Sequence, residues 1–70
     1  MPARATLNIV EQHIREAESH IARQHQIIAE LQKGGCPTVA AESLLEVFRK
    51  TLASHKEHAD RLRRQLQLKL

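Results

Sequence analysis

Histidine is the residue type in this chain whose spacing could do chemistry. The chain contains five histidines, at positions His13, His20, His25, His55 and His58. Imidazole nitrogens bind first-row metal ions, and two histidines three residues apart on a helix, such as His55 and His58, can reach the same ion. The candidates for a metal-binding site are His13, His20, His55 and His58.

Three interpretations of these histidines stay open: an interface between helices, a pH-sensitive interface and a metal site. Metal sites in helical bundles usually add carboxylates in a Glu-x-x-His arrangement, and none of the five histidines has a Glu three positions before it. The first interpretation is therefore that they lie at an interface between helices and hydrogen-bond across it. Because histidine titrates near neutral pH, such an interface could also be pH-sensitive. We expect no metal and no cofactor, with histidine-based metal binding as the alternative.

The other reactive side chain is the single cysteine, Cys36. It lies next to the expected start of a helix, where a thiolate is stabilised. No histidine and acid are held beside it, so it is expected to be an incidental loop thiol. The sequence also contains no phosphate-binding loop, nucleophile triad or pair of catalytic carboxylates. We therefore predict no catalytic residues and no enzymatic activity.

A basic cluster near the end of the chain suggests a weaker alternative, nucleic-acid binding. The cluster consists of Arg61, Arg63, Arg64 and Lys69, and it accounts for most of the net charge of +3. Binding to nucleic acid would favour a broader basic face with stacking aromatic residues, but the only aromatic residue of the Phe, Tyr and Trp class is Phe48. The cluster is expected to be a solvated helix end.

Two long helices must position these side chains, because apolar or small residues recur at heptad spacing in two runs. Gln24 interrupts the first run; a buried amide there would set the register of the helices, and otherwise it is partly exposed beside Phe48. We call these positions the seam: Leu7, Val10, Ile14, Ala17, Ile21, Gln24, Ile28, Leu31, Leu45, Phe48, Leu52, Ala59, Leu62 and Leu66.

A turn between the runs predicts a single antiparallel hairpin over residues 1–70. Gly34 and Gly35 suit a helix C-cap, Pro37 prevents the helix from continuing, and Thr38 can cap the next one. The expected bounds are 4–33 for the first helix, 34–37 for the turn and 38–67 for the second helix. With so short a connection, residues whose numbers sum to about 72 should lie at the same height.

The two sides of this hairpin differ in charge. On one side Glu11 can reach Arg63 and Glu18 can reach Lys56. The other side is apolar or histidine-rich and predicts an interface with a second copy, giving a coiled-coil-like four-helix bundle. The residues proposed for this homodimer interface are Ile27, Leu44, Val47, His13, His20 and His58, and Ile9 continues the same side.

We therefore expect a small structural or protein–protein interaction module. No apolar run approaches the roughly 18 residues of a membrane span, so no association with a membrane is expected. A lone cysteine, and first residues without the apolar segment of a secretory signal, favour the cytoplasm. Another protein is a possible partner besides a second copy.

The spacing of several residues resembles that of a group of short bacterial helical-hairpin proteins. Their pattern is H-I-x-x-Q, a gap, G-x-x-T, then A-x-x-L-L and a histidine before R-L. The matching residues here are His20, Ile21, Gln24, Ile28, Leu31, Thr38, Ala41, Leu44, Leu45, Phe48, Leu52, His55, Arg61 and Leu62. The resemblance implies a helical hairpin and no particular activity, substrate or cofactor. This chain has Cys36 and Pro37 where the pattern often has a polar pair.

Overall fold

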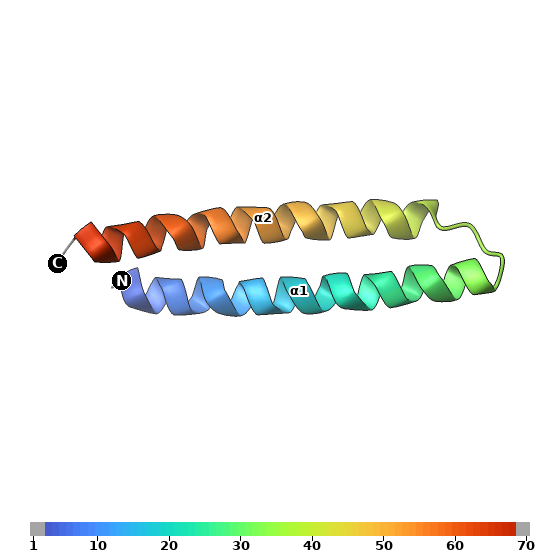
Figure 1. The fold of residues 1–70 in the computed structure, drawn as a ribbon, viewed down its shortest axis with the longest axis horizontal. Coiled ribbons are helices and arrows are strands. Elements are labelled where there is room, and N and C mark those ends of the chain that lie inside the picture. The colour runs from blue at the N-terminus through green and yellow to red at the C-terminus, as the bar shows by residue number, and fades with distance from the viewer. Residues whose placement is uncertain (1–2, 69–70) are drawn as a thin grey trace.

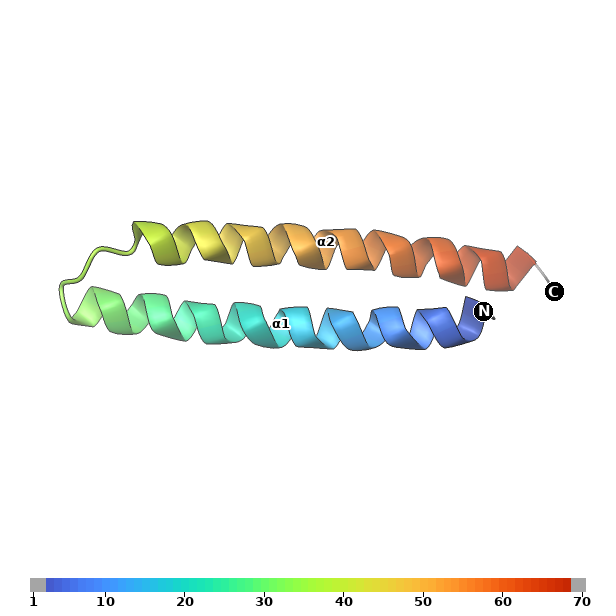
Figure 2. The same ribbon diagram turned by 180° about the vertical axis from the view of Figure 1, so that it is seen from behind.

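The fold is a hairpin of two long α-helices. The computed structural model describes residues 3–68, with helix α1 spanning Ala3–Lys33 and helix α2 spanning Val39–Leu68. The helices lie side by side and antiparallel, so the blue start of α1 and the red end of α2 share one end of a rod (Figure 1). Seen from behind, they stay adjacent along their length (Figure 2). The predicted all-α hairpin is confirmed, and the rod measures 56 × 15 × 14 Å.

The observed helix bounds differ from the predicted ones by one residue. Helix α1 begins at residue 3 instead of 4, and α2 runs from 39 to 68 instead of from 38 to 67. The terminal residues of the predicted domain, 1–2 and 69–70, lie outside the described residues, and Lys69 of the basic cluster is among them.

The end of α1 is a complete Schellman motif centred on Gly35. Gly35 has a positive φ of 69°, which an L side chain rarely adopts. Its N–H donates to the carbonyl of Gln32 at 3.1 Å, and the N–H of Cys36 donates to the carbonyl of Leu31 at 2.9 Å. These two bonds satisfy carbonyls that the helix end leaves open. The turn is therefore defined by Gly35, and Gly34 precedes it as the last helix-like residue.

Helix α2 starts immediately after Thr38. The carbonyl of Thr38 accepts a hydrogen bond from the N–H of Glu42 at 2.8 Å, which is the first bond of the helix and makes Thr38 its N-cap residue. Glu42 lies in the first turn, where a negative charge complements the helix dipole. Pro37 lies before the cap and cannot extend the helix backwards.

The two helices pack along the seam. Seven seam residues are buried and seven are half-buried. Three of the buried residues, Val10, Ala59 and Leu62, form a cluster in the half of the rod away from the turn. Ala59 is 0% exposed, yet within residues 3–68 no larger side chain is fully shielded. A single hairpin therefore leaves every large seam side chain partly in contact with solvent.

Gln24 is the buried polar residue of the seam, with 5% of its surface exposed. Its Nε2 donates a hydrogen bond of 2.8 Å to the backbone carbonyl of Ala41 in α2. Of the two alternatives for this residue, the structure therefore favours the buried amide. Because the bond joins the two helices, it ties their relative height near the turn.

Candidate interaction surface

Two rows of side chains border the seam, one on each side, and they differ in chemical character. We call them the charged flank and the uncharged flank. The charged flank is Glu11, Glu18, His25, Gln32, Glu42, Arg49, Lys56 and Arg63. The uncharged flank is Thr6, His13, His20, Ile27, Leu44, Thr51, His58 and Gln65.

An ion pair crosses between the helices on the charged flank. The Arg63 guanidinium lies 3.1 Å from the Glu11 carboxylate, as predicted, and it also pairs with Asp60 at 3.1 Å. The second predicted pair, between Glu18 and Lys56, does not form in the described part of the chain. Both side chains are exposed, and solvation of a long exposed side chain competes with such a pair.

The uncharged flank carries exposed apolar surface. Leu44 is 44% exposed, and Ile27 beside it is half-buried. Val47 and Ile9 lie beside the uncharged flank, on its side away from the seam, and are 56% and 46% exposed. Ile27, Leu44 and Val47 lie at about the same height near the turn, and Ile9 lies toward the other end of the rod. Exposed apolar side chains beside a helix seam are typical of a surface that packs against another helix.

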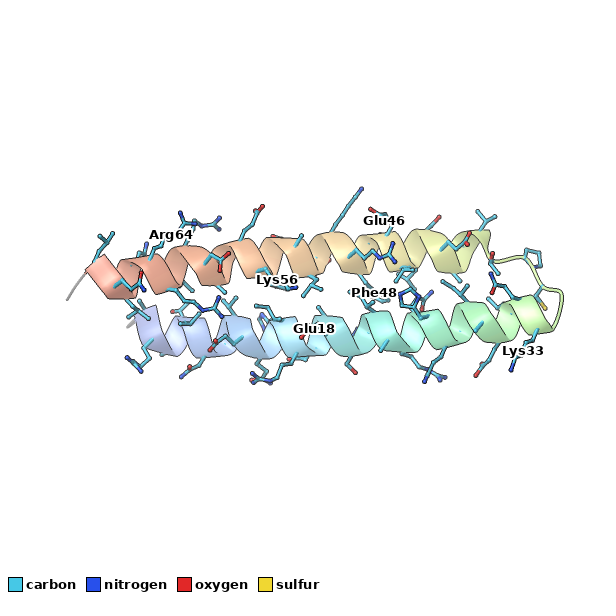
Figure 3. All side chains as sticks on the ribbon, in the orientation of Figure 1. Glu18, Lys33, Glu46, Phe48, Lys56 and Arg64 are labelled. Carbon is cyan, nitrogen blue, oxygen red and sulfur yellow. The ribbon has the colours of Figure 1, made fainter. Side chains whose placement is uncertain are left out.

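An open groove of about 380 Å³ lies between the seam and the uncharged flank near the middle of the rod, and the charged residue Glu16 is part of its lining. A smaller groove beside it shares His20 and Phe48 and is bordered by Ser19, Arg23 and Gln24. Phe48 points into the space between the helices, whereas Glu46 and Arg64 point away from α1 (Figure 3). The larger groove is lined by His13, Glu16, Ala17, His20, Val47, Phe48, Thr51 and His55.

Three of the histidines make aromatic ring contacts. The rings of His13 and His55 have centroids 5.2 Å apart and are tilted by 52°. The His20 ring meets the Phe48 ring edge-on, with centroids 5.4 Å apart. His58 is half-buried, and His25 is exposed on the charged flank. The four metal candidates are thus not gathered at one point, and within residues 3–68 no three His, Cys, Asp or Glu side chains could share a metal ion.

The proposed dimer residues occupy one side of the rod, with unequal exposure. Ile27 and His58 are half-buried, while Leu44, Val47, His13 and His20 are exposed. The sequence placed His55 on or beside this surface with the other histidines, but it did not single out Thr51, which also lines the groove. His55 lies between the seam residues Leu52 and Ala59 in α2, and its half-buried ring contacts that of His13.

The basic end of α2 is partly neutralised by its own neighbours. Arg63 is engaged by Glu11 and Asp60, and Arg64 Nε donates to the backbone carbonyl of Asp60 at 3.4 Å. Cys36 is exposed in the turn, and its Sγ lies 3.8 Å from the carbonyl oxygen of Gly34.

Comparison of the chain with protein-family models, curated proteins and solved structures gave no significant match. The resemblance to short bacterial hairpin proteins therefore stays a prediction. Neither described helix contains a segment long and apolar enough to cross a membrane.

Proposed function

We propose that this protein is a non-catalytic interaction module whose uncharged flank binds a second copy of the chain. Two hairpins then form a four-helix bundle. The observation that carries the proposal is the contrast between the flanks: the exposed side chains of Leu44, Val47 and Ile9 lie along the side that has no charged residue in its flank. Water solvates the charged side chains of the other flank better than it solvates these three apolar side chains.

The size of the surface supports a dimer. A rod of 56 × 15 × 14 Å presents a long side with a projected area of 56 × 15 Å. A side of this size has room for a standard protein–protein interface, which buries roughly 800 Å² of each partner. Helices that face the core of a bundle have an apolar stripe made of the seam and one flank. Helices of a two-stranded coiled coil have an apolar stripe made of the seam alone.

The incomplete core of the single hairpin is a second support. Phe48, Leu52 and Ile21 are only half-buried, and chains of this size usually need a disulfide, a metal or a partner subunit for stability. A single cysteine excludes an internal disulfide. A second copy laid over the uncharged flank would cover Phe48 and the groove next to it. Because a chain with one cysteine forms no internal disulfide, we also propose the reducing cytoplasm as its compartment.

Sedimentation equilibrium at micromolar concentration tests the proposal. We expect the wild-type chain to have the mass of a dimer. Val47→Glu would place a carboxylate in the apolar interface, where an unpaired charge is costly, and should weaken the dimer about 100-fold or more. His25→Glu is the matched control, because it introduces the same side chain at about the same height on the charged flank. It should leave the dimer intact.

A well-folded monomer throughout the micromolar range would overturn the proposal. So would equal weakening by Val47→Glu and His25→Glu, since the interface would then not be the uncharged flank.

A further inference from the structure

The distance between the rings of His13 and His55 is compatible with a shared metal ion. Two imidazoles that bind one tetrahedral ion, each through a nitrogen about 2.0–2.1 Å away, have ring centres about 5 Å apart. The observed centroids are separated by 5.2 Å. Helix α1 supplies one ring and helix α2 the other, so the packing of the hairpin sets their separation.

Both rings are available to a ligand. Within residues 3–68 neither imidazole forms a hydrogen bond to another protein group. They line an open groove that Glu16 also lines. A carboxylate close to a metal-binding histidine commonly accepts its second N–H and orients the ring. Two such carboxylates, one from each copy, would also offset the charge of a divalent ion.

One hairpin supplies too few ligands for a stable site. A structural tetrahedral ion takes four, and the described residues offer no group of three. A two-fold symmetric dimer doubles the pair, because each copy presents the same surface to the other. The site would therefore be complete only in the assembly.

The position of the groove lets the two pairs meet. Its residues fall at 13–20 in α1 and 47–55 in α2, near the middle of helices that run from 3 to 33 and from 39 to 68. When the two turns lie at the same end of the bundle, the grooves are at equal height by symmetry. When they lie at opposite ends, only residues at the middle of the rod come to equal height, and His13 and His55 both lie on the side of the helix midpoints away from the turn. The shared site therefore requires the two turns at the same end of the bundle.

We propose that two copies of the chain bind one Zn²⁺-type ion through His13 and His55 of each copy. This inference rests on the proposed homodimer. Imidazole ligands favour the late first-row ions Zn²⁺, Co²⁺, Ni²⁺ and Cu²⁺ over Mg²⁺ and Ca²⁺, which prefer oxygen ligands. Because only the neutral imidazole binds metal, the ion is released as the solution is acidified.

Titration of the EDTA-treated full chain with Co²⁺ tests this site, since tetrahedral Co²⁺ has strong visible d–d absorption. We expect saturation at one ion for two chains, and displacement of Co²⁺ by Zn²⁺. His13→Gln and His55→Gln should each weaken the affinity by about 100-fold or more, because even the loss of an orienting neighbour costs 10- to 100-fold. His25→Gln, on the charged flank, is the control and should bind normally. His13 is exposed, so its variant should keep the helical circular dichroism of the wild type.

Sedimentation in EDTA and in Zn²⁺ separates this inference from the proposed function. A dimer in EDTA that binds no Co²⁺ would overturn the metal site and leave the interaction module standing. A monomer in both buffers would overturn both. Binding of one ion per chain, or an equal loss of affinity in His25→Gln, would overturn the shared site, because the ligands would then come from a single copy or from another face.

Discussion

Six of the eight residues on the charged flank carry a charge, and none of the eight on the uncharged flank does. The two rows border the same seam and belong to the same two helices, so helix propensity and seam packing do not explain the difference. On the charged flank an ion pair joins α1 to α2, which favours one register of the hairpin. On the uncharged flank the side chains leave a groove and apolar surface. One flank thus serves the internal alignment of the hairpin, and the other is suited to recognition.

The largest effect that would sharpen this comparison is expected from Phe48→Ala. Phe48 lies where the seam opens toward the uncharged flank, and it is half-buried in one hairpin. If a second copy covers that flank, the truncation should cost about 3–5 kcal/mol, more than any other single truncation. Urea unfolding at a fixed chain concentration measures it, because the stability of a dimer depends on concentration.

Leu31→Ala is the control for this prediction, since Leu31 is a half-buried seam residue beside the turn and away from the groove. A smaller loss for Phe48→Ala than for Leu31→Ala would mean that the uncharged flank faces solvent.

An intermediate loss of stability is expected at the turn. The turn fixes the register of the two helices, and with it which residues face each other on both flanks. Gly35→Ala forces an alanine into a positive φ and should destabilise the protein by about 1–2 kcal/mol. At Gly34 an added Cβ would lie 3.6 Å from the nearest atom, an ordinary contact. Gly34→Ala should therefore be neutral or slightly stabilising. Thermal unfolding of the two variants checks this, and equal losses would contradict the assignment of the Schellman motif to Gly35.

The smallest effect is expected on the charged flank. The Glu11 and Arg63 side chains are 37% and 50% exposed, and exposed ion pairs contribute about 0.2–1 kcal/mol. A double-mutant cycle with Glu11→Ala and Arg63→Ala should give a coupling energy in that range, and salt should weaken it. A coupling above about 2 kcal/mol would indicate a pair removed from water. The charged flank would then be the covered one, and the comparison would be reversed.

Heptad spacing was sufficient to predict the hairpin, because a repeated stripe of apolar residues forces two helices to meet along it. It also predicted the contact between Glu11 and Arg63, since both lie at seam-flanking positions at the same height. The glycine pair predicted the turn, although only Gly35 has the conformation that demands glycine. These features depend on the backbone alone or on the position of a residue around its helix.

The contacts of long side chains could not be predicted in the same way. Glu18 and Lys56 lie in register but remain unpaired, and Gln24 reaches the carbonyl of Ala41 instead of packing only beside Phe48. Rotamers move a terminal atom by several ångströms at a fixed Cα position, and tertiary packing selects among them. The contact between His13 and His55 depends on the same kind of choice.

The Schellman turn has a consequence for measuring how two hairpins are oriented. It leaves Cys36, the only cysteine of the chain, exposed at one tip of the rod. A spin label on that thiol would act as a ruler in a dimer of the wild-type chain. With both turns at the same end, the labels would be separated by at most about two rod widths of 15 Å each. With the turns at opposite ends, the separation would approach the rod length of 56 Å, so a single distance would give the polarity of the bundle.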